Sequence, residues 1–82
     1  WINMTVNCLF FGHFKDIASD GLTIDLPEGT TVADLVDILG MQNNRFVGLD
    51  SCRAAANVEF VDKQYVLQGG DEIAFLPPMS GG

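Results

Sequence analysis

The 82-residue sequence predicts an α+β fold in which one sheet packs against a single principal helix. Three observations lead to this prediction. Segments in which apolar and polar residues alternate, as they do in strands, occur toward both ends of the chain; a segment between them has apolar residues at helical spacing; and Gly- or Pro-containing breaks separate these segments. We expect residues 1–82 to form one domain, because a chain this short has room for only one core.

The first two strands are predicted from their alternation. In "TVNCLFF", residues 5–11, Val6, Cys8 and Phe10 share one face, and the segment is apolar enough to be buried. In "LTIDL", residues 22–26, three aliphatic residues alternate with a threonine and an aspartate. The second strand should therefore have one buried and one solvated face.

The segment "TVADLVDILG", residues 31–40, predicts the principal helix. Thr31 can cap its N-terminus, Asp34 lies beside the positive end of the helix dipole, and Gly40 can close it in a left-handed conformation. One apolar stripe follows the helical spacing i, i+3, i+4, i+7: Val32, Leu35, Val36 and Leu39. This stripe should face the sheet.

The second half of the sequence predicts mainly strands. We expect residues 41–52 to be irregular or to form a short helical turn, residues 53–61 ("RAAANVEFV") to form one strand, residues 65–67 a brief strand and residues 72–76 the last strand, with turns at 62–64 and 68–71. In the last strand Ile73 and Phe75 share the core face. Leu76 then lies on the opposite, solvated face, as an exposed apolar residue.

Composition limits the classes of partner. Hydrophobic residues make up 48% of the chain and the mean hydropathy is +0.22, which is high for so small a domain and indicates that some apolar surface meets a partner. The formal net charge of -7 argues against binding to nucleic acid or to anionic membranes. The sequence has no signal peptide pattern and no membrane-spanning run, so we expect a cytoplasmic protein.

The residue types that most often carry chemistry do not form a site. Cys8 and Cys52 are too far apart in sequence for a Cys-X-X-Cys pair, and His13 has no second ligand nearby, so no metal site is predicted. We interpret Cys8 as a small core residue and His13 as a surface-loop residue. Cys52 lies at an expected junction of loop and strand, where an unreactive thiol is favoured over a reactive one. Residues 1–3 precede the first methionine and are interpreted as either an upstream extension or an artificial addition, without a function.

The C-terminal segment predicts an arm that leaves the domain. Pro77 and Pro78 have no amide hydrogen to donate to a sheet and favour an extended path, so pairing should end after Leu76. Met79, Ser80, Gly81 and Gly82 complete the arm. Because the two glycines lack side chains, they can enter a passage too narrow for other residues, and only a partner would offset the entropy lost on ordering them.

These features together resemble those of the ubiquitin-like β-grasp proteins. The closing "GDEIAFLPPMSGG" is similar to that of the small, sulfur-carrying subunits of molybdopterin synthase, and the likeness extends from "CLFFG" through the helix to "AAANVEFVD". The resemblance implies a mixed sheet packed on one helix, with a projecting Gly-Gly tail. It also implies that an E1-like enzyme uses ATP to adenylate the C-terminal carboxylate, which then becomes a thiocarboxylate and donates sulfur to a cyclic pyranopterin precursor in a large subunit.

The resemblance assigns roles to individual residues. Gly82 would carry the adenylate and then the sulfur, while residues 77–81 would insert into the large subunit, which would supply the catalytic pocket. This chain would bind no cofactor of its own. Phe60 and Leu76 match apolar positions that face the partner, although a core role fits Phe60 equally well. Lys15 matches a basic position that could pair with the activating enzyme, or it is an ordinary surface lysine.

Two alternatives to molybdopterin synthesis stay open at this stage. The chain could carry sulfur for another pathway, such as thiamine synthesis, tRNA thiolation or cysteine synthesis. It could instead be a ubiquitin-like modifier of lysines or a binding module whose glycines are incidental. The "PPMSGG" ending argues against a carrier for another sulfur pathway and favours molybdopterin synthesis. A binding module would not need a free C-terminus.

Overall fold

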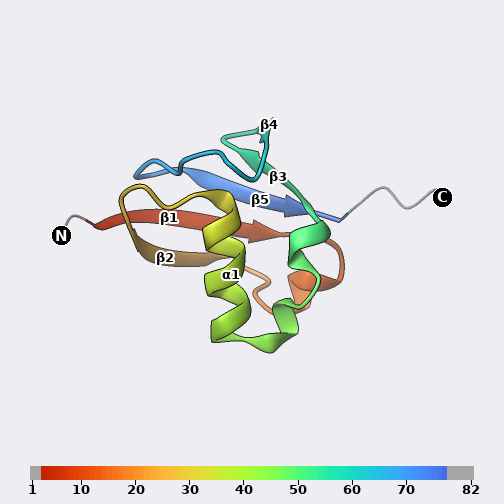
Figure 1. Ribbon diagram of the computed structural model, residues 1–82. Helices are drawn as coiled ribbons and strands as arrows, with labels where there is room; N and C mark the ends of the chain where they lie inside the picture. Colours follow the sequence, from red (N-terminus) through yellow and green to blue (C-terminus); the bar gives the residue numbers. More distant parts are fainter. Residues whose placement is uncertain (1–2, 78–82) are drawn as a thin grey trace.

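The computed structural model describes residues 3–77, apart from the side chain of His13. Its elements are β1 (Asn3–Phe10), β2 (Leu22–Pro27), α1 (Val32–Gln42), β3 (Arg53–Ala56), β4 (Glu59–Val61) and β5 (Glu72–Leu76), with 3-10 helices η1 (Gly12–Asp16), η2 (Asn44–Phe46) and η3 (Leu49–Ser51). Figure 1 shows α1 lying across one face of the sheet. The predicted α+β architecture is confirmed.

The sheet is mixed and has the strand order β2-β1-β5-β3-β4. The two strands nearest the ends of the chain, β1 and β5, pair in parallel at its centre, with Cys8 opposite Ile73 and Phe10 opposite Phe75. The other neighbouring strands pair antiparallel. β5 lies at the centre of the sheet and pairs with β1 on one side and β3 on the other (Figure 1). The segment that follows β5 therefore begins at a strand that is hydrogen-bonded along both edges.

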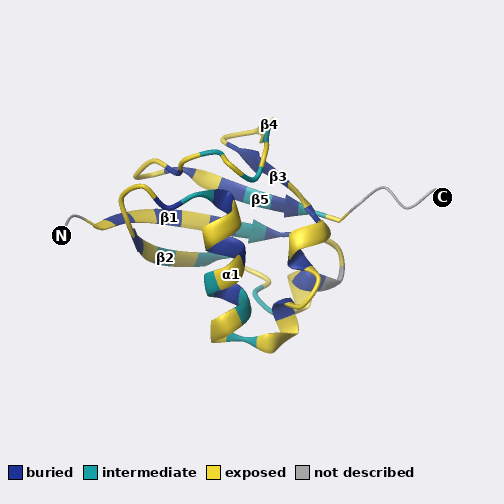
Figure 2. Cartoon of the chain, in the orientation of Figure 1, coloured by how far each residue is buried: buried dark blue, intermediate teal, exposed yellow. Residues whose placement is uncertain are grey.

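The core lies between α1 and the sheet face that it covers. The predicted alternation holds, because Val6, Cys8, Phe10, Ile73 and Phe75 are all buried. The predicted helical stripe is buried as well: Val32, Leu35, Val36 and Leu39. Figure 2 shows buried residues along α1 and along the strands of the sheet. Each buried aliphatic or aromatic side chain contributes roughly 1.5–3 kcal/mol to this packing.

The helix begins as predicted but ends later. Thr31 and Asp34 form a reciprocal capping box, in which the Thr31 hydroxyl accepts from the Asp34 amide and the Asp34 carboxylate accepts from the Thr31 amide, both at 3.2 Å. The prediction that Gly40 closes the helix is wrong. Gly40 lies within α1, which continues to Gln42 and is capped by Asn43. A helix tolerates one interior glycine at a cost of about 1 kcal/mol relative to alanine.

Three strand predictions also need correction. The predicted strand of residues 53–61 is two strands, β3 and β4, joined by a tight turn at Asn57 and Val58. Residues 65–67 form no strand of the sheet, and only Val66 makes an isolated bridge, to Thr31. The first strand covers Asn3–Phe10 rather than residues 5–11. Of the two alternatives for residues 41–52, the helical one is correct, although the structure has two short 3-10 helices, η2 and η3, in place of one turn. Within residues 3–77, no helix is long and apolar enough to cross a membrane.

Candidate functional site

The sheet face opposite α1 is not covered by any element of residues 3–77. One register line crosses this face from β1 to β4, with Leu9 opposite Ala74, Ala74 opposite Ala55, and Ala55 opposite Phe60. Two large side chains therefore stand at the ends of the row and two small ones at its centre. This large-small-small-large pattern leaves a hollow along β5 and β3 because no side chain fills the middle.

The hollow is an apolar groove of about 250 Å³. Eight residues line it: Leu9, Phe11, Ala55, Val58, Phe60, Glu72, Ala74 and Leu76. Phe60 is 58% exposed and Phe11 is 41% exposed, so aromatic surface stands at the groove's rim. Exposed apolar surface arranged around a hollow is typical of sites that bind a partner. We call these eight residues the open-face groove.

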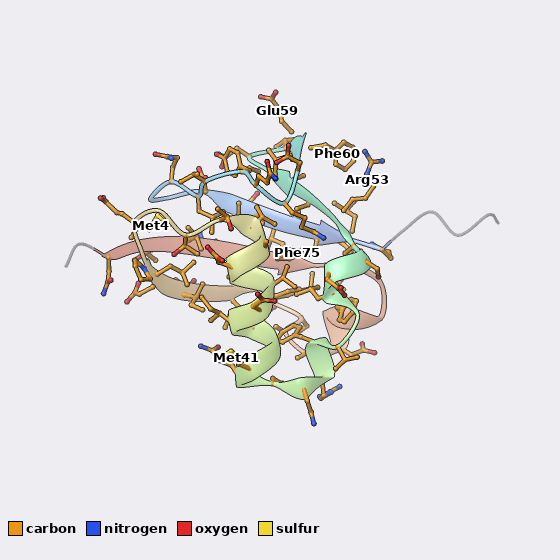
Figure 3. All side chains as sticks on the ribbon, viewed as in Figure 1. Met4, Met41, Arg53, Glu59, Phe60 and Phe75 are labelled. Atoms are coloured by element: carbon orange, nitrogen blue, oxygen red, sulfur yellow. The ribbon has the colours of Figure 1, made fainter. Side chains whose placement is uncertain are left out.

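Phe60 is held in place at the edge of the groove. The guanidinium carbon of Arg53 lies 4.0 Å from the centroid of the Phe60 ring, a distance at which the cation is attracted to the ring face. Figure 3 shows the two side chains together at β3 and β4, away from the core residue Phe75. The core role considered for Phe60 is excluded, since the ring is mostly exposed. Its predicted position on a partner-facing surface is consistent with this exposure.

Leu76 and Pro77 lie where the groove meets the start of the C-terminal arm. Leu76 is on the predicted face but is half-buried rather than exposed, because it lines the groove beside other apolar side chains. Pro77 lies against Gly12, which has a φ of +68° and would place an added Cβ 3.0 Å from the Pro77 ring. A side chain at residue 12 would thus crowd the root of the arm. Pro78, Met79, Ser80, Gly81 and Gly82 lie outside the described residues.

Lys15 lies in η1, the 3-10 helix that begins at Gly12, and its side chain is exposed. It is on the protein surface at the same end of β1 as Pro77, because Gly12 contacts that proline. Its predicted pairing with an activating enzyme stays a prediction. Among the described residues, no cluster of histidine, cysteine and carboxylate side chains could hold a metal ion.

Both cysteines are buried, which agrees with the interpretation of Cys8 as a core residue and of Cys52 as an unreactive thiol. Burial raises the pKa of Cys8 to about 12. Burial also raises the pKa of Cys52, with a smaller opposing influence from Lys63 and a smaller reinforcing one from Asp50. Since only the thiolate is a strong nucleophile, neither side chain is suited to attack a substrate at neutral pH.

A buried carboxylate connects the turn between β3 and β4 to the segment that precedes β5. Asp71 precedes β5 and accepts hydrogen bonds from three donors: the Asn57 side-chain amide at 2.8 Å, the Tyr65 hydroxyl at 2.9 Å and the Gln68 backbone amide at 2.9 Å. Burial acts to raise the pKa of Asp71, but these hydrogen bonds to its charged form outweigh burial and leave the pKa below its ordinary value. The hydrogen bond between the Tyr65 hydroxyl and Asp71 also raises the pKa of Tyr65. The sequence indicated only a turn-flanking acid here.

Several residues of the open-face groove were not identified from the sequence. Leu9 and Phe11 alternate with the buried residues of β1, a signal that could have placed them on the opposite face. Ala55 and Val58 could not be placed in the same way, because the turn between β3 and β4 was not recognised. The structure brings Phe60 and Leu76 to one groove and leaves Lys15 outside it.

Comparison with known proteins identifies the family. The model of the ThiS family matches residues 8–82. The chain belongs to the ThiS family. One similar protein is the molybdopterin synthase sulfur carrier subunit of Mycobacterium tuberculosis, which is 33% identical to this chain over 82 residues. The alignment covers 94% of this chain and 96% of that protein. The protein of the same name from Drosophila erecta is 30% identical over 83 residues, covering 96% and 92%.

Solved structures of related proteins are also similar to this ThiS-family chain. A Pyrococcus furiosus protein provisionally named molybdopterin converting factor, subunit 1, has a TM-score of 0.80 at 27% identity, covering 93% of this chain and 99% of that one. A chain in the complex of subunits 1 and 2 of the molybdopterin-converting factor of Helicobacter pylori has a TM-score of 0.64 at 28% identity, covering 96% and 100%. The ubiquitin of Caldiarchaeum subterraneum, at 12% identity and a TM-score of 0.68 over 99% and 100%, confirms the predicted ubiquitin-like fold.

Proposed function

We propose that this protein is the sulfur carrier subunit of a molybdopterin synthase. The observation that supports this proposal best is the apolar open-face groove, which ends at Leu76, directly before the arm that terminates in Gly81 and Gly82. Relatives that match nearly the whole chain carry the name of this subunit. A groove beside the root of the arm would let one partner hold the domain while it receives the C-terminus.

The chemistry of the proposed carrier resides at the C-terminal carboxyl group. A carboxylate resists nucleophilic attack because it is anionic and has a poor leaving group. An E1-like enzyme would transfer AMP from ATP to Gly82, releasing pyrophosphate, and a sulfur nucleophile would then displace AMP to give the thiocarboxylate. The sulfur of a thiocarboxylate is a soft anion that attacks electrophilic carbon more readily than an oxygen anion does.

In this proposal the sulfur of Gly82 bonds to a carbon of a cyclic pyranopterin precursor held by the large subunit and displaces an oxygen substituent, which leaves that carbon with the electron pair of the broken C–O bond. Water then attacks the acyl carbon, breaks its bond to sulfur and restores the carboxylate of Gly82. This chain needs to supply no general acid or base and no bound cofactor, because the pocket and the proton-transferring groups belong to the partner. We place this cycle in the cytoplasm, with the large subunit and the E1-like enzyme as the two partners.

The C-terminus offers a direct test. The purified chain is incubated with ATP, a sulfide donor and the E1-like enzyme from the same genome, and its intact mass is measured. We expect a product heavier by the exchange of one oxygen for sulfur, and we expect no such product from a variant lacking Gly82 or from one extended by a residue. Both variants should retain the parent melting temperature, since β5 ends at Leu76.

The control for this test is sulfur transfer in the complete synthase. The loaded carrier is mixed with the large subunit and a cyclic pyranopterin precursor, and dithiolene formation is followed. Full activity of the extended variant would contradict the proposal, because the reacting atom would then not be the terminal carboxyl carbon. Adducts linked to lysines of other proteins would instead identify a modifier.

A further inference from the structure

The turn between β3 and β4 contains a residue that its backbone disfavours. Asn57 has a φ of 51° and Val58 a φ of 77°, and Ala56 pairs directly with Glu59 across the turn. Two-residue turns of this kind favour asparagine at the first position and glycine at the second. A β-branched valine at the second position is strained, because its side chain crowds the backbone in the left-handed region.

The fold does not benefit from the Val58 side chain. Its side chain is 92% exposed, the largest exposure among the large hydrophobic residues of the described chain. Burial against other parts of the chain therefore cannot offset the strain. A strained residue that persists without a stabilising contact often has a functional role.

Hydrogen bonds hold the turn in this conformation. The Asn57 amide donates to the Glu72 carbonyl at 2.9 Å, and the Glu72 amide donates to the Asn57 side-chain oxygen at 3.0 Å. The Asn57 side-chain amide donates to Asp71 at 2.8 Å. The strained turn is thus attached at three points to the start of β5, which fixes the place of Val58 relative to the groove.

Val58 and Leu76, the last residue of β5, lie at opposite ends of the open-face groove. Val58 lines the groove beside Glu72, the first residue of β5, whereas the arm begins after Leu76, the last. These two residues of β5 are separated by about 13 Å, given the rise per residue of a strand. A partner that contacts both ends is held at two points, so it rotates less freely against the domain than a partner held only near the arm.

We propose that Val58 is a specificity-determining contact of the surface that docks on the large subunit. Its side chain inserts into an apolar site of that subunit and, with Leu76 at the other end, fixes the angle from which the arm enters. This inference rests on the proposed function. The Phe60 ring, which lies against Arg53, lines the groove between Leu76 and Val58. The apolar surface is therefore continuous from one end to the other.

Three substitutions at Val58 separate backbone strain from side-chain contact. Val58→Gly relieves the strain and removes the side chain, so we expect the melting temperature to rise by about 3–5 °C and the Kd for the large subunit to increase about tenfold. Val58→Thr keeps the shape and the strain but replaces one methyl group by a hydroxyl, so we expect an unchanged melting temperature and a Kd about fivefold higher. Val58→Ile should retain the parent affinity.

These Kd values are measured by calorimetric titration into the large subunit from the same genome. The carrier is used without sulfur, with Gly82 ending in its carboxylate. The matched control is Val47→Thr, because Val47 is 77% exposed but does not line the groove. It should bind with the parent Kd. A gain in melting temperature together with a loss of affinity in Val58→Gly is a combination that a merely structural role would not produce.

The outcomes distinguish this inference from the proposed function. If the parent chain binds the large subunit and Val58→Gly binds equally well, Val58 is not a contact and only this inference is overturned. If Val47→Thr weakens binding as much as Val58→Thr, the effect is not specific to the groove and the inference is likewise overturned. If the parent chain does not bind the large subunit at all, both proposals are wrong.

Discussion

The two faces of β5 show how a strand of five residues serves both the fold and the proposed docking. On one face Ile73 and Phe75 are fully buried beneath α1. On the other, Ala74 and Leu76 are half-buried and line the groove. Because successive side chains of a strand point to opposite sides, stability and binding depend here on alternate residues of one segment.

The difference between the faces lies in how the large side chains are distributed. On the core face, aromatic rings from three elements meet, with the ring centroids of Phe10 and Phe75 5.7 Å apart and those of Phe10 and Phe46 5.0 Å apart. On the open face, the large side chains of Leu9 and Phe60 are separated by two alanines. A filled row stabilises the domain, whereas an interrupted row leaves room for a partner's side chain.

The largest expected effect comes from the core face. Phe75→Ala removes a fully buried ring that stacks on Phe10, so we expect the free energy of unfolding to fall by about 3–5 kcal/mol. Urea unfolding followed by circular dichroism measures this loss. The matched substitution on the other face, Phe60→Ala, should change the free energy of unfolding by less than about 1 kcal/mol. Equal losses would show that the two faces do not differ as described.

The next effect concerns binding. Leu76→Asp places a charge in the apolar groove at the root of the arm, so we expect the Kd for the large subunit to increase at least about thirtyfold. The free energy of unfolding should fall by only about 1 kcal/mol, because Leu76 is half-buried and can turn a polar group toward solvent. Titration calorimetry and urea unfolding of the same preparation separate the two. A variant that unfolds would place Leu76 in the core.

Much of the core face could be predicted from the sequence. Hydrophobic periodicity depends on the backbone's own repeat, so the stripe from Val32 to Leu39 and the pair Ile73 and Phe75 were identified without knowledge of the fold. The reciprocal cap at Thr31 and Asp34 is likewise a local feature. These elements contact one another, but each of them carries its own signal.

The open face was harder to predict because its signals are not local. Val58 has high strand propensity, so residues 53–61 resembled one strand, and the glycine that usually indicates such a turn is absent. Asp71 forms hydrogen bonds to residues 3 to 14 positions away, which no short motif encodes. Phe60 lay within the undivided strand, so alternation could not give its face, and only the family resemblance suggested a partner-facing role.

The last effect concerns the hydrogen bonds of Asp71, which hold the β3–β4 turn against the start of β5. Asp71→Asn replaces an oxygen that only accepts hydrogen bonds with an amide that also donates, although the donors of Asn57, Tyr65 and Gln68 all need acceptors. We expect the free energy of unfolding at pH 7 to fall by about 1–3 kcal/mol. The loss should depend on pH. Because the folded-state pKa of Asp71 is below its ordinary value of 3.8, the carboxylate stabilises the fold fully above pH 5 or so.

As pH falls through the ordinary value and then through the lower folded-state value, the parent chain loses this contribution while Asp71→Asn has none to lose. The difference in free energy of unfolding between the two chains should therefore shrink toward pH 3, as urea unfolding at several pH values would measure. Glu72→Gln is the control, since this neighbouring carboxylate is exposed on the open face and its substitution should change the free energy of unfolding at pH 7 only slightly. A difference for Asp71→Asn that stays constant from pH 7 to pH 3 would mean that the hydrogen-bond geometry, and not the charge of Asp71, holds the β3–β4 turn against β5.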